Sequence, residues 1–313
     1  MVAESSRDRS VCQQICAEHG DAFQHAHPRY QTAYDDGLVA KRLACGNPDK
    51  MGDVEYRCLQ CGQGKYLVSM SCKSSLCLRC AKVYADTWGS QVSQVLHEGV
   101  SYRQIILTVP AMFHLTFYHN AAVLLSAFRR CGVPCMDDFY SDVRGKALRG
   151  GYLAVLHTHG RHGQYPPHLH LIAPSGGYDA QGQRWEPRQY LPSALLRRTW
   201  QWPLLRMVRQ TLQTEDIHRL VDACCRPYPD GLVTNVPKGH VPSPSQSVAR
   251  YVAKYVVSPP IAVRRIDRYD GERVTDHYRS HRTARVEHAT VDVDTCIGRM
   301  VQHTMPKGFK RIR

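Results

Sequence analysis

The stretch PPHLHLIA, residues 166–173, places His168 and His170 one residue apart in an apolar run introduced by two prolines. Successive side chains of a β-strand point to opposite faces, so residues two apart share a face. Both imidazoles therefore point the same way. A single strand histidine is more often a packed core or surface residue, but burying two imidazoles without partners costs free energy. The pair therefore predicts a divalent metal site.

A site with two histidines needs a further protein ligand. The preceding run GYLAVLHT, residues 151–158, predicts another strand, and its end carries His157. The connection HGRHGQYPP is short and contains Gly and Pro, which suggests antiparallel neighbours in one sheet. Such a neighbour brings His157 alongside the pair, although His159 on the same face or His162 in the connection could replace it.

Six cysteines lie between residues 45 and 80. Cys58-x2-Cys61 and Cys77-x2-Cys80 are separated by 15 residues, a spacing that allows two knuckles to close a tetrahedral thiolate zinc site. The alternative is four buried structural thiols. Cys72 could replace one ligand, because Cys72-x4-Cys77 can also chelate, and Cys45 is left as a spare or as a ligand of a weaker second site. The metal would substitute for a core that this short segment cannot build.

The charge balance points to a polyanionic partner. Lysine and arginine number 41 against 27 acidic residues, which gives a formal net charge of +14 and a pI near 9.3. Such a balance favours nucleic acid, because each neutralised phosphate releases condensed counterions. A soluble basic surface without a partner is the alternative. Hydrophobic residues make up 43% of the chain, which excludes global disorder.

The start MVAESSRDRS lacks the apolar core of a signal peptide, and no run of 18 apolar residues occurs. We therefore expect a cytoplasmic protein without a membrane anchor. In that reducing compartment the 13 cysteines are expected to be thiols and metal ligands rather than disulfides.

The tyrosines of ARYVAKYVV complete the set of candidate residues. Tyr251 and Tyr255 are four apart on a predicted helix, residues 245–256, and therefore lie on one face, with Lys254 on the adjoining turn. Alone, this spacing is more often a packing face than a catalytic pair. A phenol with a pKa of about 10 is also a poor nucleophile unless a metal polarises its target.

Three regions follow from these patterns. Residues 1–44 are expected to form a helical arm, and residues 45–100 the zinc module with a helix over 81–99. Residues 101–313 are expected to form the main domain, which starts with the strand YRQIILTVP at 102–110 and a helix over about 115–130. We expect an insertion at about 178–242, with two helical segments interrupted by Pro203 and by PYPDG. Asp270-Gly271 predicts a hairpin.

In this order, paired cysteine knuckles, VLHTHG, PPHLHLI and YVAKY resemble the rolling-circle, two-tyrosine transposases of the IS91 type, in the HUH (His-hydrophobic-His) superfamily. The ending HTMPKGFKRIR is also similar, and the likeness covers about residues 45–313. Three positions depart from the usual pattern: Pro167, His159 and Leu76 stand where these proteins commonly have His, Trp and His.

The resemblance implies an α+β fold, in which a central antiparallel sheet bears the histidines and helices flank it. It implies that His168 and His170 are the metal-binding pair and that Cys58, Cys61, Cys77 and Cys80 bind structural Zn²⁺. Mg²⁺ or Mn²⁺ suits phosphate chemistry at the histidines, with His157 as the third ligand expected from the strand geometry. It makes Tyr251 and Tyr255 the nucleophiles that cleave single-stranded DNA through a 5′-phosphotyrosine link. Basic residues near the tyrosines and in the last segment are expected to hold the DNA backbone: Lys254, Arg264, Arg265, Arg268, Lys307, Lys310 and Arg311.

Two other interpretations remain open on the sequence alone. A replication initiator or relaxase uses the same chemistry, although a zinc module at the front favours the transposase. A non-catalytic zinc-dependent DNA-binding protein would use the same histidines and tyrosines only for packing. Metal-dependent nicking separates these two classes.

Overall fold

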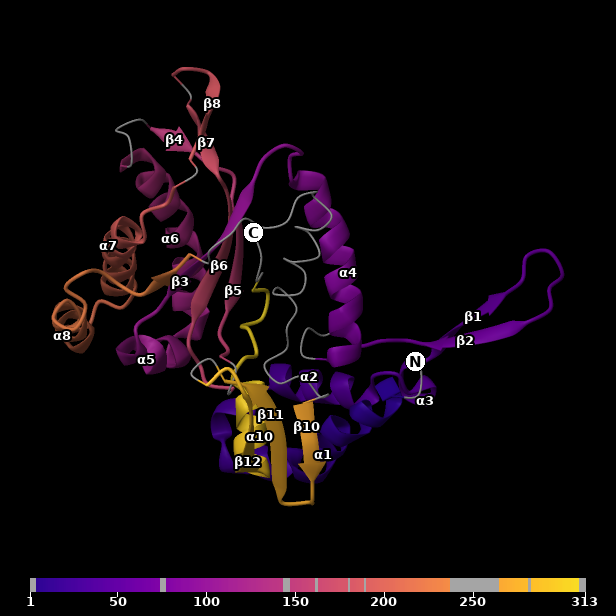
Figure 1. Cartoon of the computed structure of the whole chain (residues 1–313). Coiled ribbons are helices and arrows are strands. Elements are labelled where there is room, and N and C mark those ends of the chain that lie inside the picture. Colours follow the sequence, from indigo (N-terminus) through magenta and orange to yellow (C-terminus); the bar gives the residue numbers. More distant parts are fainter. Residues whose placement is uncertain are drawn as a thin grey trace. The chain divides into compact units, whose positions relative to one another are not determined.

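A computed structural model describes residues 4–73, 77–142, 147–160, 163–179, 181–188, 190–236, 265–280 and 283–309 (Figure 1). The chain divides into two compact units. The first comprises residues 1–87, 161–163 and 257–304, and the second comprises residues 88–160, 164–256 and 305–313. Helices and antiparallel sheets occur in both units, which confirms the predicted α+β class.

The second unit is built on a four-stranded sheet with the order β5-β6-β3-β9. These strands are β3 (Tyr102–Thr108), β5 (Leu153–His157), β6 (His168–Pro174) and β9 (Thr234–Asn235). β5 and β6 are antiparallel neighbours, as the short connection predicted. The alternation of β6 divides its two faces: Leu169 and Leu171 are buried in the main core, whereas His168 and His170 lie on the other face.

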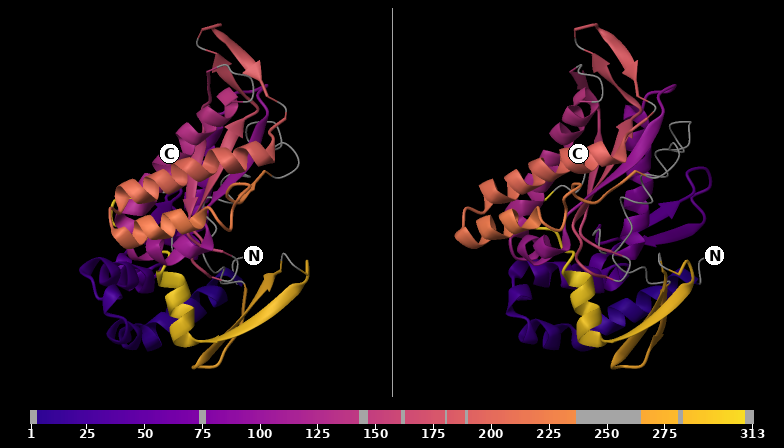
Figure 2. Two further views of the ribbon diagram at one scale, coloured as in Figure 1. Left: turned by 90° about the vertical axis from the view of Figure 1, so that its left-hand side faces the viewer. Right: turned by 60° about the vertical axis from the view of Figure 1, so that its left-hand side comes forward.

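Two long helices cover the core face of this sheet (Figure 2), namely α6 (Ala121–Asp142) and α7 (Ser193–Thr211). Phe128 of α6 and Trp200 of α7 are fully buried with ring centroids 5.7 Å apart. The Trp200 indole N–H also donates to the carbonyl of Thr108 at 2.9 Å. This contact joins α7 to β3 at the strand end nearest the histidines.

The predicted insertion at 178–242 is therefore corrected. α7 supplies core side chains, β9 pairs with β3, and α8 (Glu215–Cys224) packs beside α7. Pro203 lies inside α7 instead of interrupting it. A proline within a helix costs about 3 kcal/mol, and the burial of Trp200, Leu204 and Leu205 around it offsets that cost.

Shorter elements complete the second unit. A 3₁₀ turn η2 (Ala111–Phe113) and helix α5 (His114–His119) follow β3 and bury Phe113 and Phe117. A three-stranded sheet has the order β4-β7-β8. Its strands are β4 (Leu148–Arg149), β7 (Gly176–Asp179) and β8 (Arg184–Pro187).

The first unit combines the N-terminal segment with a segment from the last quarter of the sequence. Helix α1 (Glu4–Ala26) shares a core with helix α10 (Val293–Val301) and with a three-stranded sheet of order β10-β11-β12. These strands are β10 (Ile266–Tyr269), β11 (Arg273–Arg279) and β12 (Val286–Asp292). The hairpin at Asp270-Gly271 is confirmed, with Gly271 at φ 100°.

This packing corrects the predicted domain boundaries. The N-terminal arm is not separate, and residues 265–304 belong with it instead of with the main domain. Ile15 and Phe23 of α1 are buried against Ile297 and Met300 of α10. The cause is complementary apolar faces far apart in sequence, which local periodicity cannot pair.

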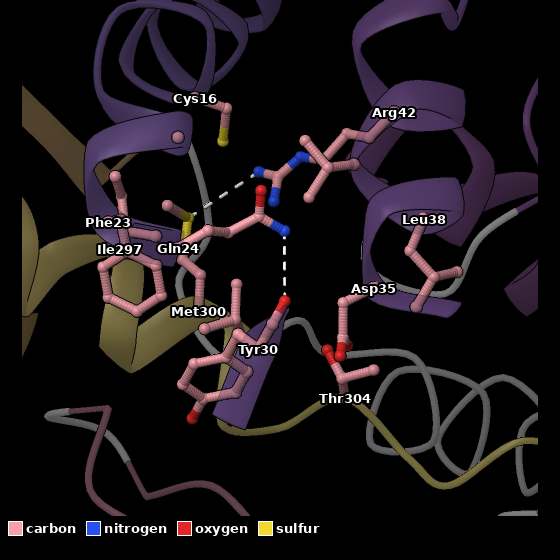
Figure 3. A pocket seen from close by; sticks show the side chains of 13 residues that line it. Cys16, Phe23, Gln24, Tyr30, Asp35, Leu38, Arg42, Ile297, Met300 and Thr304 are labelled. Atoms are coloured by element: carbon pink, nitrogen blue, oxygen red, sulfur yellow. Dashed lines mark hydrogen bonds between the residues drawn. The ribbon is translucent and has the colours of Figure 1, made fainter. Parts of the chain in front are cut away.

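A small cavity lies within the first unit (Figure 3). It is lined mainly by α1, α10 and helix α2 (Ala33–Ala44), and among its lining residues are Phe23, Leu38, Arg42 and Met300. Its volume is about 50 Å³, which is small beside the roughly 300–1,000 Å³ of typical ligand pockets. The cavity is therefore a weak candidate for a substrate site.

Asp292 caps the helix that closes this unit. Its carboxylate accepts from the Thr295 N–H at 2.7 Å and from the Thr295 hydroxyl at 2.9 Å. The backbone hydrogen bond from Thr295 is the main reason that the pKa of Asp292 is lowered from 3.8. Because the folded pKa is the lower one, the charged cap contributes stability above pH 3.8 and loses it as the pH falls below that value.

We expect Asp292→Ala to destabilise the first unit by about 1 kcal/mol at neutral pH, because the N–H at the start of α10 loses its acceptor. Thermal unfolding of the full chain measures the change. Asp21→Ala removes the same charge from an exposed position of α1 and serves as the control. Equal melting temperatures for the two variants would contradict a capping role for Asp292.

Candidate metal centres

A cluster of four cysteines occupies the first unit: Cys45, Cys72, Cys77 and Cys80, whose sulfurs all lie within 4.8 Å of one another. Cys45 follows the last residue of α2, Cys72 follows strand β2 (Lys65–Ser69), and Cys80 lies in the first turn of helix α4 (Leu78–Val95). The side chain of Gln13 donates to the carbonyls of Arg42 and Cys45 at 3.1 and 3.3 Å. Helix α1 therefore fixes the segment that carries Cys45.

The geometry of this cluster fits a tetrahedral zinc site. The Cys45–Cys80, Cys45–Cys77 and Cys72–Cys80 sulfur distances are 3.6, 3.5 and 3.5 Å. A zinc tetrathiolate with Zn–S bonds of about 2.3 Å has sulfurs about 3.8 Å apart. The Cys72 backbone N–H also points at the Cys45 sulfur at 3.4 Å, a contact that supports a thiolate. These four residues would hold the zinc.

Only two of the four predicted zinc ligands lie in the cluster. Cys77 and Cys80 enter the cluster, whereas Cys58 and Cys61 are exposed at the turn between β1 (Asp53–Arg57) and β2. The backbone N–H groups of Cys61 and Gln60 lower the pKa of the Cys58 thiol. The β1–β2 hairpin places Cys58 and Cys61 outside the cluster. The other two members of the cluster are Cys72, the predicted alternative ligand, and Cys45, the predicted spare.

The second candidate centre lies on the face of the four-stranded sheet opposite the main core. His157, His168 and His170 offer ligand nitrogens that all lie within 4.8 Å of one another. His157 on β5 is directly opposite His168 on β6, and His170 is two residues further along that strand. The ring centroids are 4.5 Å apart for His157 and His170 and 4.8 Å apart for His168 and His170. The structure thus brings together the three histidines that the sequence singled out.

Burial keeps the rings of His168 and His170 in the neutral form, which is the form that binds metal. Burial lowers the pKa of His168, and burial together with the neighbouring His168 lowers the pKa of His170 to about 3. Both imidazoles are therefore neutral at pH 7, with a lone pair to share. The Nδ1–H of His168 donates to the Pro166 carbonyl at 2.7 Å, which leaves Nε2 for an ion.

Neighbouring residues extend the histidine centre. His159, the predicted substitute, stacks on His157 with centroids 5.0 Å apart, whereas His162 lies outside the described residues. Sequence reasoning missed Gln104 of β3, whose side-chain amide is 2.7 Å from His170 Nδ1. It also missed His114 of α5, which lowers the pKa of His168 slightly further. The sequence did offer a signal for Gln104, because it is a polar residue within the otherwise apolar run YRQIILTVP.

The remaining predicted residues are only partly described. Tyr251, Lys254, Tyr255, Arg264, Lys310 and Arg311 lie outside the described residues, as does the predicted helix at 245–256. Arg268 and Lys307 are exposed. Arg265 is instead half-buried, donates to the His277 carbonyl at 2.5 Å and pairs with Asp276 at 3.4 Å. Its guanidinium is therefore engaged within the fold.

Fold and site together define an α+β protein with a thiolate cluster of zinc geometry and a three-histidine centre on an antiparallel sheet. Comparison with known proteins then gives the family. The family model described as "Putative transposase" matches residues 151–313, and the IS91 model described as "Transposase zinc-binding domain" matches residues 15–109. The chain belongs to this transposase family, as the order of its motifs predicted.

Two relatives agree with this assignment. The transposase for insertion sequence element IS801 of Pseudomonas savastanoi pv. phaseolicola is 28% identical over 292 residues, which cover 88% of this chain and 68% of the relative. The putative transposase y4qJ of Sinorhizobium fredii is 26% identical over 314 residues, which cover 96% of this chain and 78% of the relative. No solved structure matches the chain.

The family assignment carries two general consequences. DNA is the partner on which a transposase acts, and the cysteine cluster supports zinc as a resident ion. In the part of the chain that the structure describes, every helix is too short or too polar to cross a bilayer.

Proposed function

We propose that this transposase cleaves and rejoins single-stranded DNA by metal-dependent tyrosine transesterification, as in rolling-circle transposition. The observation that carries the proposal is the cluster of three buried or half-buried histidines on the face of the sheet opposite the main core. A packing role does not explain why three imidazoles share one site beside apolar strands. A bound metal ion would explain the cluster, because it would give each buried imidazole a partner.

Tyr251 and Tyr255 are the proposed nucleophiles. The phenolate oxygen of one tyrosine attacks a backbone phosphorus, a new phosphorus–oxygen bond forms, and the bond to the 3′ oxygen breaks. The products are a 5′-phosphotyrosine link and a free 3′-OH, which gains a proton from the solvent. Attack by an acceptor 3′-OH reverses these bonds and joins strands without ATP. Two tyrosines allow a second exchange while the first link persists.

The histidines would hold the ion that this chemistry needs. A bound divalent ion supplies Lewis-acid polarisation of the phosphate oxygens and aligns the scissile bond. Three imidazole nitrogens without a carboxylate among the described ligands suit a transition metal, so we favour Mn²⁺ over Mg²⁺. His168 and His170, whose pKa values are lowered by burial, would hold the ion together with His157.

Exposed basic residues would bind the DNA backbone. Arg268 and Lys307 have exposed side chains that could reach a phosphate. Each phosphate contact on single-stranded DNA makes the affinity depend more steeply on salt concentration. The paired Arg265 is a weaker candidate than the sequence suggested, because its guanidinium already bonds His277 and Asp276.

A denaturing gel tests the proposed reaction. The purified protein is incubated with labelled single-stranded DNA carrying element ends and Mn²⁺ or Mg²⁺. We expect a protein–DNA adduct that survives denaturation and disappears with chelator. The double variant Tyr251→Phe, Tyr255→Phe should lose the adduct, whereas Tyr190→Phe, which removes a hydroxyl from an exposed tyrosine, should retain it. DNA binding without an adduct under every metal would indicate a non-catalytic DNA-binding protein instead.

A further inference from the structure

Gln104 lies beside the histidine centre on β3. Its side chain points to the histidine face, because Gln104 is two residues before Ile106, the cross-strand partner of His170. Gln104 is only 6% exposed, and its amide nitrogen Nε2 lies 2.7 Å from Nδ1 of His170. The proposed reaction leaves this buried polar residue without an assigned role.

The contact decides which nitrogen of His170 can bind an ion. A neutral imidazole carries one N–H, so a proton on Nδ1 leaves a lone pair on Nε2, and the reverse. The two ends of the Gln104 amide exchange places by rotation about the last side-chain bond. With its oxygen toward Nδ1, Gln104 accepts the N–H and frees Nε2. With its nitrogen there, as the structure places it, Gln104 donates to Nδ1, and Nε2 of His170 keeps the proton.

His168 shows which state suits the centre. Its Nδ1 meets the Pro166 carbonyl at 2.7 Å, and a carbonyl can only accept, so the proton stays on Nδ1 and Nε2 is available. His170 lies on the same strand and shares the same face, with its Nδ1 toward a side chain of the neighbouring strand. Both rings then offer Nε2 only if Gln104 turns its oxygen to His170.

We propose that Gln104, with its amide rotated so that the oxygen faces His170, is a positioning residue that holds His170 in the Nδ1–H form and thereby makes Nε2 the metal ligand. The proposal rests on the proposed function only in that the histidines bind a divalent ion. Partners that orient ligating histidines typically change metal affinity 10- to 100-fold when removed, so the effect of Gln104 is large enough to measure.

Two substitutions of similar size separate the possible roles of the amide. Gln104→Glu keeps an acceptor, and its ionised carboxylate cannot donate. Gln104→Met fills the same space without a strong hydrogen-bonding group. Mn²⁺ affinity, measured by electron paramagnetic resonance titration of the full chain without DNA, should fall about 10- to 100-fold in Gln104→Met. In Gln104→Glu it should be kept or increased.

A spectroscopic measurement reads the tautomer directly. Nitrogen-15 chemical shifts of the His170 ring in the metal-free protein should indicate Nδ1–H in the wild type and in Gln104→Glu, and a mixture in Gln104→Met. Thr108→Val is the control, because the Thr108 hydroxyl lies on the same strand but donates to the Val233 carbonyl. Its Mn²⁺ affinity should be unchanged.

Two results would overturn the positioning role. Equal loss of Mn²⁺ affinity in Gln104→Glu and Gln104→Met would mean that the amide must donate, and unchanged affinity in Gln104→Met would mean that it does nothing for the ion. Neither readout needs DNA cleavage. An inactive enzyme that still binds Mn²⁺ in a Gln104-dependent way would therefore contradict only the proposed reaction.

Discussion

Cys72→Ser is expected to empty the zinc site, so that zinc falls from about one ion per chain to near zero. Cys72 is one of four cysteines whose sulfurs lie within 4.8 Å of one another, and a structural zinc site requires all four positions. Zinc binding in small modules of this kind contributes on the order of 10 kcal/mol to folding. The segment around the cluster should therefore lose its structure with the metal.

Metal analysis of the purified protein measures the loss, and hydrogen exchange of residues 45–80 should show reduced protection. Cys61→Ser is the matched control, because Cys61 is exposed at the tip of the β1–β2 hairpin. We expect this variant to retain its zinc. If Cys61→Ser lost its zinc and Cys72→Ser kept it, the ligand set suggested by the two C-x2-C spacings would be correct and the cluster of the structure would be refuted.

The cysteines illustrate where sequence reasoning stopped. Spacing favoured Cys58 and Cys61, because two C-x2-C knuckles are a common zinc pattern. It could not reveal that residues 53–69 form a hairpin that carries this pair away from Cys77 and Cys80. Cys45 enters the cluster from a position 27 residues before Cys72, at the end of α2. Such a contact depends on tertiary packing, which no local pattern encodes.

The histidines illustrate the opposite case. His168 and His170 share a face because strands alternate, and His157 reaches them because a short connection forces β5 and β6 to run antiparallel. Both inferences need only local geometry, and the structure agrees with them. Gln104 lies 66 residues before its partner His170 and on a strand whose place in the sheet was not predicted. The core packing of α1 with α10 escaped prediction for the same reason.

The histidine centre gives the second large effect. We expect His170→Ala to reduce formation of the protein–DNA adduct at least about 1,000-fold, because the ion proposed to polarise the phosphate would lose a ligand. Lewis-acid stabilisation of developing charge is worth several kcal/mol, and each 1.36 kcal/mol corresponds to a factor of ten in rate. Single-turnover cleavage of labelled single-stranded DNA at saturating protein measures the rate.

A pair of neighbouring variants identifies the third ligand. His157 and His159 stack with centroids 5.0 Å apart, but only His157 has a nitrogen within 4.8 Å of ligand atoms on both His168 and His170 in the cluster. His157→Ala should therefore slow cleavage nearly as much as His170→Ala, whereas His159→Ala should have an effect of less than about tenfold. DNA affinity should change little in all three variants, because the proposed role of these rings is to hold the ion, and the basic residues are proposed to bind the phosphates. If cleavage slowed more in His159→Ala than in His157→Ala, His159 would be the third ligand instead. Normal cleavage by His170→Ala would mean that the reaction does not use this centre, and the case for a metal-dependent transesterase at the three histidines would fail.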